Sequence, residues 1–227
     1  MNKSVLVVYS CYNPPTSLID SIQSLYDKRI INDVKHKIIC IDNNSNVTST
    51  YDVVKEQFPN VEIIFTKNKN YEWGAYKYAY THYDYDLYFC LQDTIIFEEP
   101  FDINSIEDNS PYTIFHSGGF KNMGRGFSSQ DLLNHRLFKQ NINFDNMVDE
   151  DFILCQHNTF LITKHDLAKL FKTLINPPIS KIDAEMYERI FGAYFDKTNY
   201  KRRVLNPYIK KINKEYRIFI TDTYGKL

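Results

Sequence analysis

Two carboxylates, Asp42 and Asp93, each follow a short apolar run within the first hundred residues. The runs read KIICID and FCLQD. Carboxylate oxygens bind hard divalent cations and accept hydrogen bonds from hydroxyl groups, so both residues could hold a ligand. Aspartate also forms turns after strands, which is the structural alternative for each of them. The elements that carry the two residues decide between these readings.

Short β-branched runs alternate with amphipathic segments up to residue 97, a pattern typical of βαβ units and of a parallel, doubly wound sheet. Strands with their trailing turns are expected at 4–10, 35–46, 60–70 and 86–97, and helices at 13–27, 48–58 and 72–83. Beyond a strand at 112–116 and a glycine-rich loop, a strand leads into a helix within 151–171. A further helix is expected at 176–197, followed by a basic tail.

Polar residues stand at the end of each of the first four expected strands. In an open α/β sheet the ligand crevice lies beyond the carboxyl ends of the strands, so these residues are the candidates for a site. They are Ser10, Tyr12 and Asn13, then Asp42, Asn43, Asn44 and Ser45, then Thr66, Lys67 and Asn68, and finally Gln92, Asp93 and Thr94.

Composition limits the classes of function. The chain has 227 residues, a formal net charge of −1 and a pI near 6.6, which gives no electrostatic reason to expect a nucleic-acid partner. No apolar run approaches the roughly twenty residues of a transmembrane helix, and the N-terminal run is too short for a signal peptide. The four cysteines have no Cys-x-x-Cys spacing and are predicted to be buried free thiols. We expect one cytoplasmic domain with no transmembrane segment.

Four motifs in succession resemble the GT-A fold of nucleotide-sugar glycosyltransferases, most closely glycosyltransferase family 2. The motifs are VVYSCYNPPTSLIDSIQSL, IICIDNNSN, NKNYEWGAYKYAY and FCLQDTII. The resemblance implies an α/β fold with a mostly parallel central sheet flanked by helices, and a smaller acceptor-side C-terminal subregion. It implies a nucleotide-sugar-binding half at 1–100 and an acceptor-binding half at 101–227, together one domain.

The same resemblance assigns roles to individual residues. Those implied to contact the nucleotide sugar are Ser10, Tyr12, Asn13, Asp42, Asn70, Gly74, Lys77, Gln92 and Asp93. The last motif is similar to the Asp-Gln-Asp-Ser form found among rhamnosyltransferases and related enzymes, with Leu91 in place of the first Asp. Asp93 is then the implied ligand of Mn²⁺ or Mg²⁺. One carboxylate suffices chemically, because Mg²⁺ keeps several waters and the diphosphate supplies further oxygens. Lys77 could also be a solvated residue of a helix face.

An inverting transfer needs a carboxylate that takes the proton of the acceptor hydroxyl. In the resembled enzymes this base stands at a helix start before an Arg, and the matching stretch is KIDAEMYERIFG. Asp183 is the first candidate and Glu185 the second, with the VDED cluster at 148–151 as a third. Asp183 could instead cap the helix, and Glu185 could form a surface ion pair with Arg189.

Two further features keep alternative readings. His157 is predicted to be structural or to contact the acceptor, and the basic tail to be a solvated face, with closure over a diphosphate as its alternative. The function expected from all of these residues is transfer of a hexosyl or deoxyhexosyl group from a UDP- or TDP-type donor to a glycan or other hydroxyl acceptor. The alternative is a non-catalytic GT-A scaffold that binds nucleotide, glycan or a partner protein.

Overall fold

The computed structural model describes residues 3–116, 136–137, 154–197 and 200–212. Its centre is a seven-stranded sheet in the order β3-β2-β1-β4-β7-β6-β8, and four of the six strand pairings are parallel. The strands are β1 (Val5–Cys11), β2 (His36–Asn43), β3 (Glu62–Thr66), β4 (Leu87–Gln92), β6 (Tyr112–His116), β7 (Leu154–Thr163) and β8 (Arg203–Val204). The GT-A-type α/β architecture expected from the sequence is therefore confirmed.

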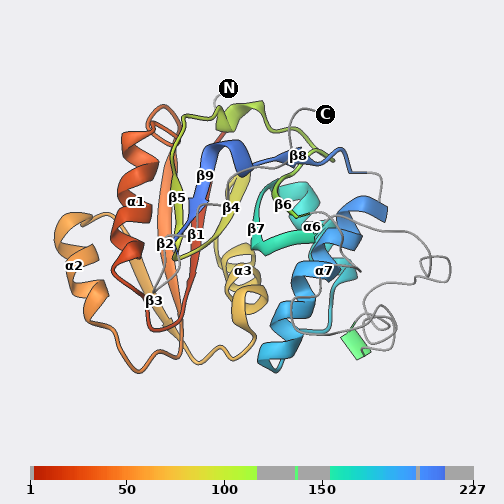
Figure 1. The fold of residues 1–227 in the computed structure, drawn as a ribbon, viewed down its shortest axis with the longest axis horizontal. Helices are drawn as coiled ribbons and strands as arrows, with labels where there is room; N and C mark the ends of the chain where they lie inside the picture. The colour runs from red at the N-terminus through yellow and green to blue at the C-terminus, as the bar shows by residue number, and fades with distance from the viewer. Residues whose placement is uncertain (1–2, 117–135, 138–153, 198–199, 213–227) are drawn as a thin grey trace.

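Helices cover both faces of this sheet, as Figure 1 shows. One face carries α1 (Ser17–Asp27) and α2 (Ser49–Gln57), and the other carries α3 (Tyr71–His82), α6 (Lys164–Thr173) and α7 (Lys181–Lys197). All seven residues of β1 are buried, which explains why the run VLVVYSC shows no polar alternation. Its side chains point alternately into the two apolar clusters, one under each helical layer.

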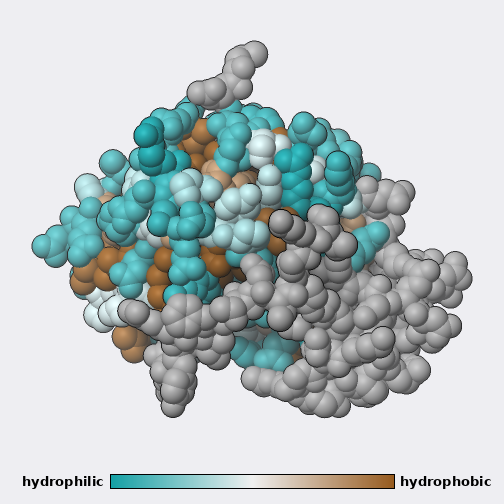
Figure 2. Space-filling view, turned by 45° about the horizontal axis from the view of Figure 1, so that its top comes forward, coloured by the Kyte–Doolittle hydropathy of each residue, from teal (hydrophilic) through white to brown (hydrophobic). Residues whose placement is uncertain are grey.

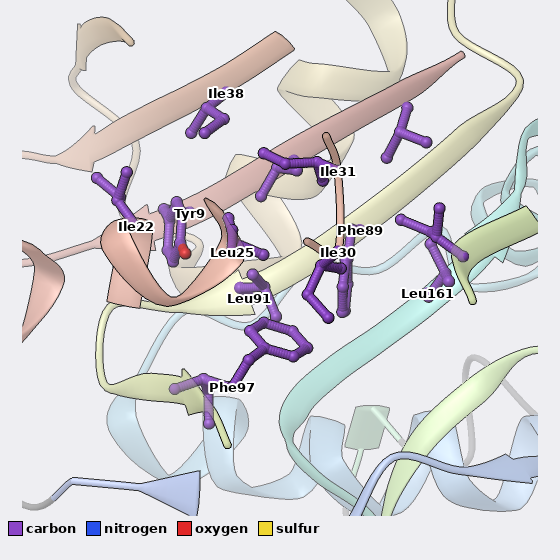
Figure 3. Close-up of a cluster of buried hydrophobic side chains, with 14 of the residues drawn as sticks. Tyr9, Ile22, Leu25, Ile30, Ile31, Ile38, Phe89, Leu91, Phe97 and Leu161 are labelled. Carbon is purple, nitrogen blue, oxygen red and sulfur yellow. The ribbon is translucent and has the colours of Figure 1, made fainter. Parts of the chain in front are cut away.

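The cluster under α1 includes Leu91, the residue that takes the first acidic position of the resembled metal motif. Its side chain is fully buried and lies among Tyr9, Leu25 and Phe97 (Figure 3). The following residue, Gln92, is half-buried and turns to the opposite face, as the two-residue period of a strand requires. Position 91 is thus a core position of the apolar cluster.

A second, two-stranded sheet joins distant parts of the chain. Strand β5 (Ile95–Phe97) follows the turn at Asp93, and β9 (Ile209–Lys211) pairs with it in antiparallel register, Ile95 opposite Lys211. The backbone N–H of Ile212 donates to the carbonyl of Thr94 at 2.8 Å. Residues 200–212 of the segment predicted as a basic tail are therefore built into the fold, and β9 lies beside the end of β4.

The prediction of a solvated basic face is wrong for part of this segment. The side chain of Arg202 is only 4% exposed and forms a 2.8 Å ion pair with Asp196. It also donates to Oγ1 of Thr113 and to the carbonyl of Leu154. Lys201, in contrast, is exposed.

The described surface is mainly hydrophilic on the face shown in Figure 2, with apolar residues visible between polar ones. Within the described ranges, no helix combines the length and the apolar character that crossing a bilayer requires.

Candidate functional site

A pocket of about 710 Å³ lies at the carboxyl ends of β1, β2 and β4, where an α/β sheet is expected to bind its ligand. The start of α3, the segment before α7 and the end of β9 complete its wall. The lining residues are Ser10, Cys11, Tyr12, Asn43, Asn44, Asn46, Asn68, Lys69, Tyr71, Glu72, Gln92, Asp93, Thr94, Ile179, Lys181, Lys211 and Ile212.

Four residues predicted to bind the donor line this pocket: Ser10, Tyr12, Gln92 and Asp93. The Tyr12 side chain is 56% exposed, so a large part of its ring is available to a planar ligand. The strand ends therefore converge as the sequence predicted for these four residues. Whether they bind a nucleotide stays a prediction.

Amide side chains join the loops of the pocket. Nδ2 of Asn43 donates to Oγ of Ser10 at 2.8 Å, and Nδ2 of Asn68 donates to Oδ1 of Asn43 at 2.6 Å. Asn13 links the first two loops in the same way, because its Oδ1 accepts from the backbone N–H groups of Asn46 and Val47. Asn13 itself is not part of the pocket lining.

Asp42 has a structural environment. It is 2% exposed and lies behind the pocket wall, where its carboxylate accepts from the Tyr51 hydroxyl at 2.7 Å and from the Ser45 N–H at 2.8 Å. Burial and the neighbouring carboxylate raise the pKa of Tyr51, so the phenol keeps its proton and donates. This arrangement matches the turn-forming alternative that the sequence left open.

Asn70, Gly74 and Lys77 lie at a different cavity, of about 440 Å³, which α3 lines together with the end of β3. The ammonium of Lys77 is 4.8 Å from the centroid of the Phe171 ring, a cation–π contact. Gly74 packs closely on Asn68, since a Cβ at position 74 would lie 2.2 Å from Oδ1 of that residue. The structure thus separates these three residues from the four that line the larger pocket.

The two predicted bases are on α7, but neither lines the pocket. Asp183 is 4% exposed, accepts from the Ile179 N–H at 2.9 Å and forms a 2.7 Å ion pair with Arg136. It therefore holds the segment whose Ile179 and Lys181 do line the pocket. Glu185 is half-buried. The VDED cluster lies outside the described residues.

A group of residues that sequence reasoning did not connect meets around Lys211, and three of its members, Glu72, Gln92 and Lys211, line the pocket. Nζ of Lys211 is 3.0 Å from Oε1 of Gln92 and 2.9 Å from Nδ1 of His157. Nε2 of Gln92 donates to Glu72 at 2.8 Å, and Glu188 lies 3.7 Å from Nδ1 of His157. These residues come from five elements, so only the folded chain brings them together.

Burial sets the charge states in this group. Burial raises the pKa of Glu188 to about 7, against the opposing effects of Lys211 and Arg189. Burial also lowers the pKa of Lys211, while Glu188, Glu72 and Asp93 raise it. These three carboxylates partly offset the effect of burial and so favour the protonated form of this lysine.

A local irregularity of the backbone places His157. Strand β7 bulges between its pairings with Thr113 and Phe115, and His157 and Asn158 have positive φ angles of 58° and 49°. Such conformations are unfavourable for residues other than glycine and cluster at functional sites. No feature of the run CQHNTF indicates this bulge.

The pocket does not contain a preformed metal site among the described residues. Asp93 and Glu72 are carboxylates of the lining, but Glu72 accepts from Gln92, and position 91 supplies a buried leucine. The amide oxygen of Gln92 accepts from an ammonium group, which a cation would have to displace. The Mn²⁺ or Mg²⁺ expected at Asp93 stays a prediction.

The described part of the chain offers one cluster with the composition of a metal site, near the start of β4, at the opposite end of that strand from the pocket. Asp108, His165 and Asp166 place one ligand atom each within 4.8 Å of the others. Thr163 donates to Asp108, and the Asn109 N–H and Lys169 contact Asp166, so protein donors already serve these carboxylates. Thr163 pairs with Leu87 at the start of β4, which places the cluster far from Asp93 along that strand.

The fold and the pocket define a GT-A-type α/β protein with a polar crevice at its strand ends. No family model matches the sequence, and no curated protein matches it. Among solved structures, the chain is similar to a mannosyltransferase from Pyrobaculum calidifontis in complex with GDP-Man and Mn²⁺, with a TM-score of 0.57 and 11% identity. The match covers 96% of this chain, which spans 59% of the length of that protein. At this identity the likeness shows a shared fold.

Proposed function

We propose that the protein is a glycosyltransferase that moves a sugar from a nucleoside-diphosphate donor to a hydroxyl acceptor. The observation that carries this proposal is the polar pocket at the carboxyl ends of β1, β2 and β4, in a fold shared with a mannosyltransferase. Its volume of about 710 Å³ falls within the roughly 300–1,000 Å³ usual for small-molecule sites. Residues 1–100 would supply most of the donor site, to which Lys181 and Lys211 of the second half would add positive charge, and residues 101–227 would bind the acceptor.

The chemistry of the lining suits such a donor. Asn43, Asn44 and Asn46 offer amide groups to sugar or base hydroxyls and carbonyls, and the exposed ring of Tyr12 can stack on a base. Lys69, Lys181 and Lys211 place positive charge around the same space, as a diphosphate requires. A UDP- or TDP-type donor, a hexosyl or deoxyhexosyl group, and inversion at the anomeric carbon complete the proposal.

The divalent cation need not bind before the nucleotide does. Mn²⁺ or Mg²⁺ would arrive with the diphosphate, with Asp93 as its protein carboxylate, and would stabilise negative charge on the leaving group. Titration of Mn²⁺ into the protein with and without nucleotide measures this directly. Metal binding that is equally tight without nucleotide would contradict it.

The base for the acceptor hydroxyl is proposed to lie on α7. Asp183 and Glu185 are the sequence candidates. Glu188 is added because its carboxylate, 23% exposed, lies beside His157 and Lys211, although it is not among the lining residues either. Asp183 already holds the Ile179 N–H and Arg136, which favours a positioning role. Loss of the acidic limb of the pH–rate profile in Glu188→Gln, with the limb retained in Glu185→Gln, would assign the base to Glu188.

The experiment that tests the function is an assay of donor hydrolysis and transfer with a panel of UDP-, TDP- and GDP-sugars. Turnover of one donor above the rate of a heat-treated control supports an enzyme. Nucleotide binding without turnover of any donor, with simple hydroxyl acceptors present, would favour the alternative of a non-catalytic scaffold. That alternative is supported by one observation, the absence of both sequence-predicted bases from the pocket lining.

A further inference from the structure

Lys211 occupies an unusual position for a lysine. Its Nζ lies against the pocket, between the amide oxygen of Gln92 and the ring nitrogen of His157, at 3.0 and 2.9 Å. Both direct partners are uncharged acceptors when His157 is the neutral tautomer with its proton on Nε2, because Nδ1 then carries the lone pair. The carboxylates that act on Lys211 most strongly are Glu188, Glu72 and Asp93, in that order.

The backbone fixes this position. Lys211 stands opposite Ile95 in the β5–β9 pair, one residue before the Ile212 N–H that donates to Thr94. The turn at Gln92–Asp93–Thr94 and the lysine are therefore held together by main-chain hydrogen bonds. The preceding residue, Lys210, leads away from the pocket and forms an ion pair with Glu98 at 3.1 Å.

The energetics argue for a ligand at this lysine. Removing an ammonium group from water is costly unless charge and hydrogen bonds compensate, and burial here lowers its pKa. An ammonium has three N–H donors, and the two contacts within the described ranges use two of them. The third can serve a ligand that enters the pocket.

We propose that Lys211 binds the diphosphate of the donor and supplies, from the chain itself, the positive charge that the resembled motif would draw from a metal ion. The inference rests on the proposed function and deepens it. Gln92 and His157 position the ammonium. Leu91 is compatible with this arrangement, because a carboxylate at position 91 is not needed for metal binding when Lys211 supplies the positive charge at the diphosphate. Nucleoside diphosphates should then bind without any divalent cation.

Isothermal titration in EDTA tests the proposal with UDP, TDP, GDP and the corresponding nucleosides. The wild-type protein should bind at least one diphosphate without metal. Lys211→Met should weaken that binding about 10- to 100-fold, the range of a lost charge-assisted hydrogen bond, while nucleoside binding stays within about two-fold. Lys210→Met, which removes the same charge from the same strand, should leave both affinities unchanged.

Lys211→Arg is the second variant, because it keeps the charge if the methionine variant fails to fold. It should retain most of the diphosphate affinity, and the affinity of the wild-type protein should fall with added salt. Equal affinity of Lys211→Met and wild type in EDTA would overturn the inference, as would wild-type binding that appears only with Mn²⁺. In both cases nucleotide still binds, so the proposed function survives. Absence of all nucleotide and nucleoside binding would instead overturn the proposed function and the inference with it.

Discussion

Nζ of Lys211 lies 3.0 Å from Oε1 of Gln92, although 119 residues separate the two along the chain. The contact joins the end of β4, a central strand of the large sheet, to β9 of the small β5–β9 sheet. It changes the character of the LQDT turn, since a cation that belongs to the protein lies beside this turn, where the resembled motif has two carboxylates and this chain has Asp93 alone. Four predictions distinguish residues that line the pocket from residues that support the structure around it.

Asp93→Ala should abolish the metal-dependent part of turnover and leave the melting temperature within about 2 °C of the wild type. Asp93 lines the pocket and stands in a turn, so its carboxylate contributes to the site more than to the core. Turnover measured across a Mn²⁺ titration checks this. Glu56→Ala is the control, because it removes an exposed carboxylate of α2. Unchanged metal dependence in Asp93→Ala would show that the metal assignment is wrong.

Asp42→Ala and Tyr51→Phe should both lower the free energy of unfolding, by roughly 1–3 kcal/mol, because each removes part of a buried hydrogen-bonded pair. Denaturant titration measures this. Nucleotide affinity distinguishes the two roles of Asp42. A ribose contact by Asp42 would weaken binding in Asp42→Ala only, whereas a purely structural Asp42 would affect binding similarly in both variants. We expect the second result.

Gly74→Ala should destabilise the protein, although Gly→Ala inside a helix normally stabilises by about 1 kcal/mol. The reason is that the new Cβ would lie 2.2 Å from Oδ1 of Asn68. That amide also donates to Asn43, so a displaced Asn68 should loosen the pocket wall. A double-mutant cycle with Asn68→Ala isolates the clash, since Gly74→Ala should become neutral or stabilising once the Asn68 amide is gone. Equal effects in both backgrounds would contradict the close contact.

The pH dependence of stability should report Glu188. Its pKa rises from an ordinary 4.5 to about 7 on folding, so the folded state holds the proton more tightly. Stability should therefore be highest below pH 4.5 as far as this group is concerned, and should fall between about pH 4.5 and 7. The loss amounts to roughly 3 kcal/mol at most. Glu188→Gln should flatten this part of the curve and be more stable than wild type at pH 8, which chemical denaturation across pH can measure.

The sheet and the first three helices could be predicted because their signals are local. The run VLVVYSC is too short for a helix and uniformly apolar, and it forms a strand buried on both faces. The alternation of strands and helices along the chain predicted that Ser10, Tyr12, Gln92 and Asp93 stand at the carboxyl ends of neighbouring strands. All four line the pocket. Strand ends can be read from sequence because each is fixed by a change from apolar to polar residues.

The rest of the site depends on tertiary pairing that leaves no local pattern. In the sequence, Lys210 and Lys211 are two equivalent basic residues. Only the register of β9 with β5 directs Lys211 toward Gln92 and Lys210 toward Glu98. Asp42 has the sequence environment of a ligand residue, but the Tyr51 hydroxyl reaches its carboxylate from α2. No sequence feature distinguishes Glu188 from other carboxylates of a helix. Its environment depends on His157 of β7 and Lys211 of β9, which the fold brings to it.

The amide links between the loops have a consequence for how a ligand would bind. Asn68, Asn43 and Ser10 form a continuous line of side-chain hydrogen bonds across three strand ends, and Asn13 and Asn44 hold positive φ angles of 47° and 66° beside it. Loops fixed in this way lose little conformational freedom when a ligand binds, because their conformational entropy has already been lost during folding. Association should accordingly resemble docking into a rigid receptor, with a fast on-rate and a heat-capacity change no larger than the buried ligand surface accounts for.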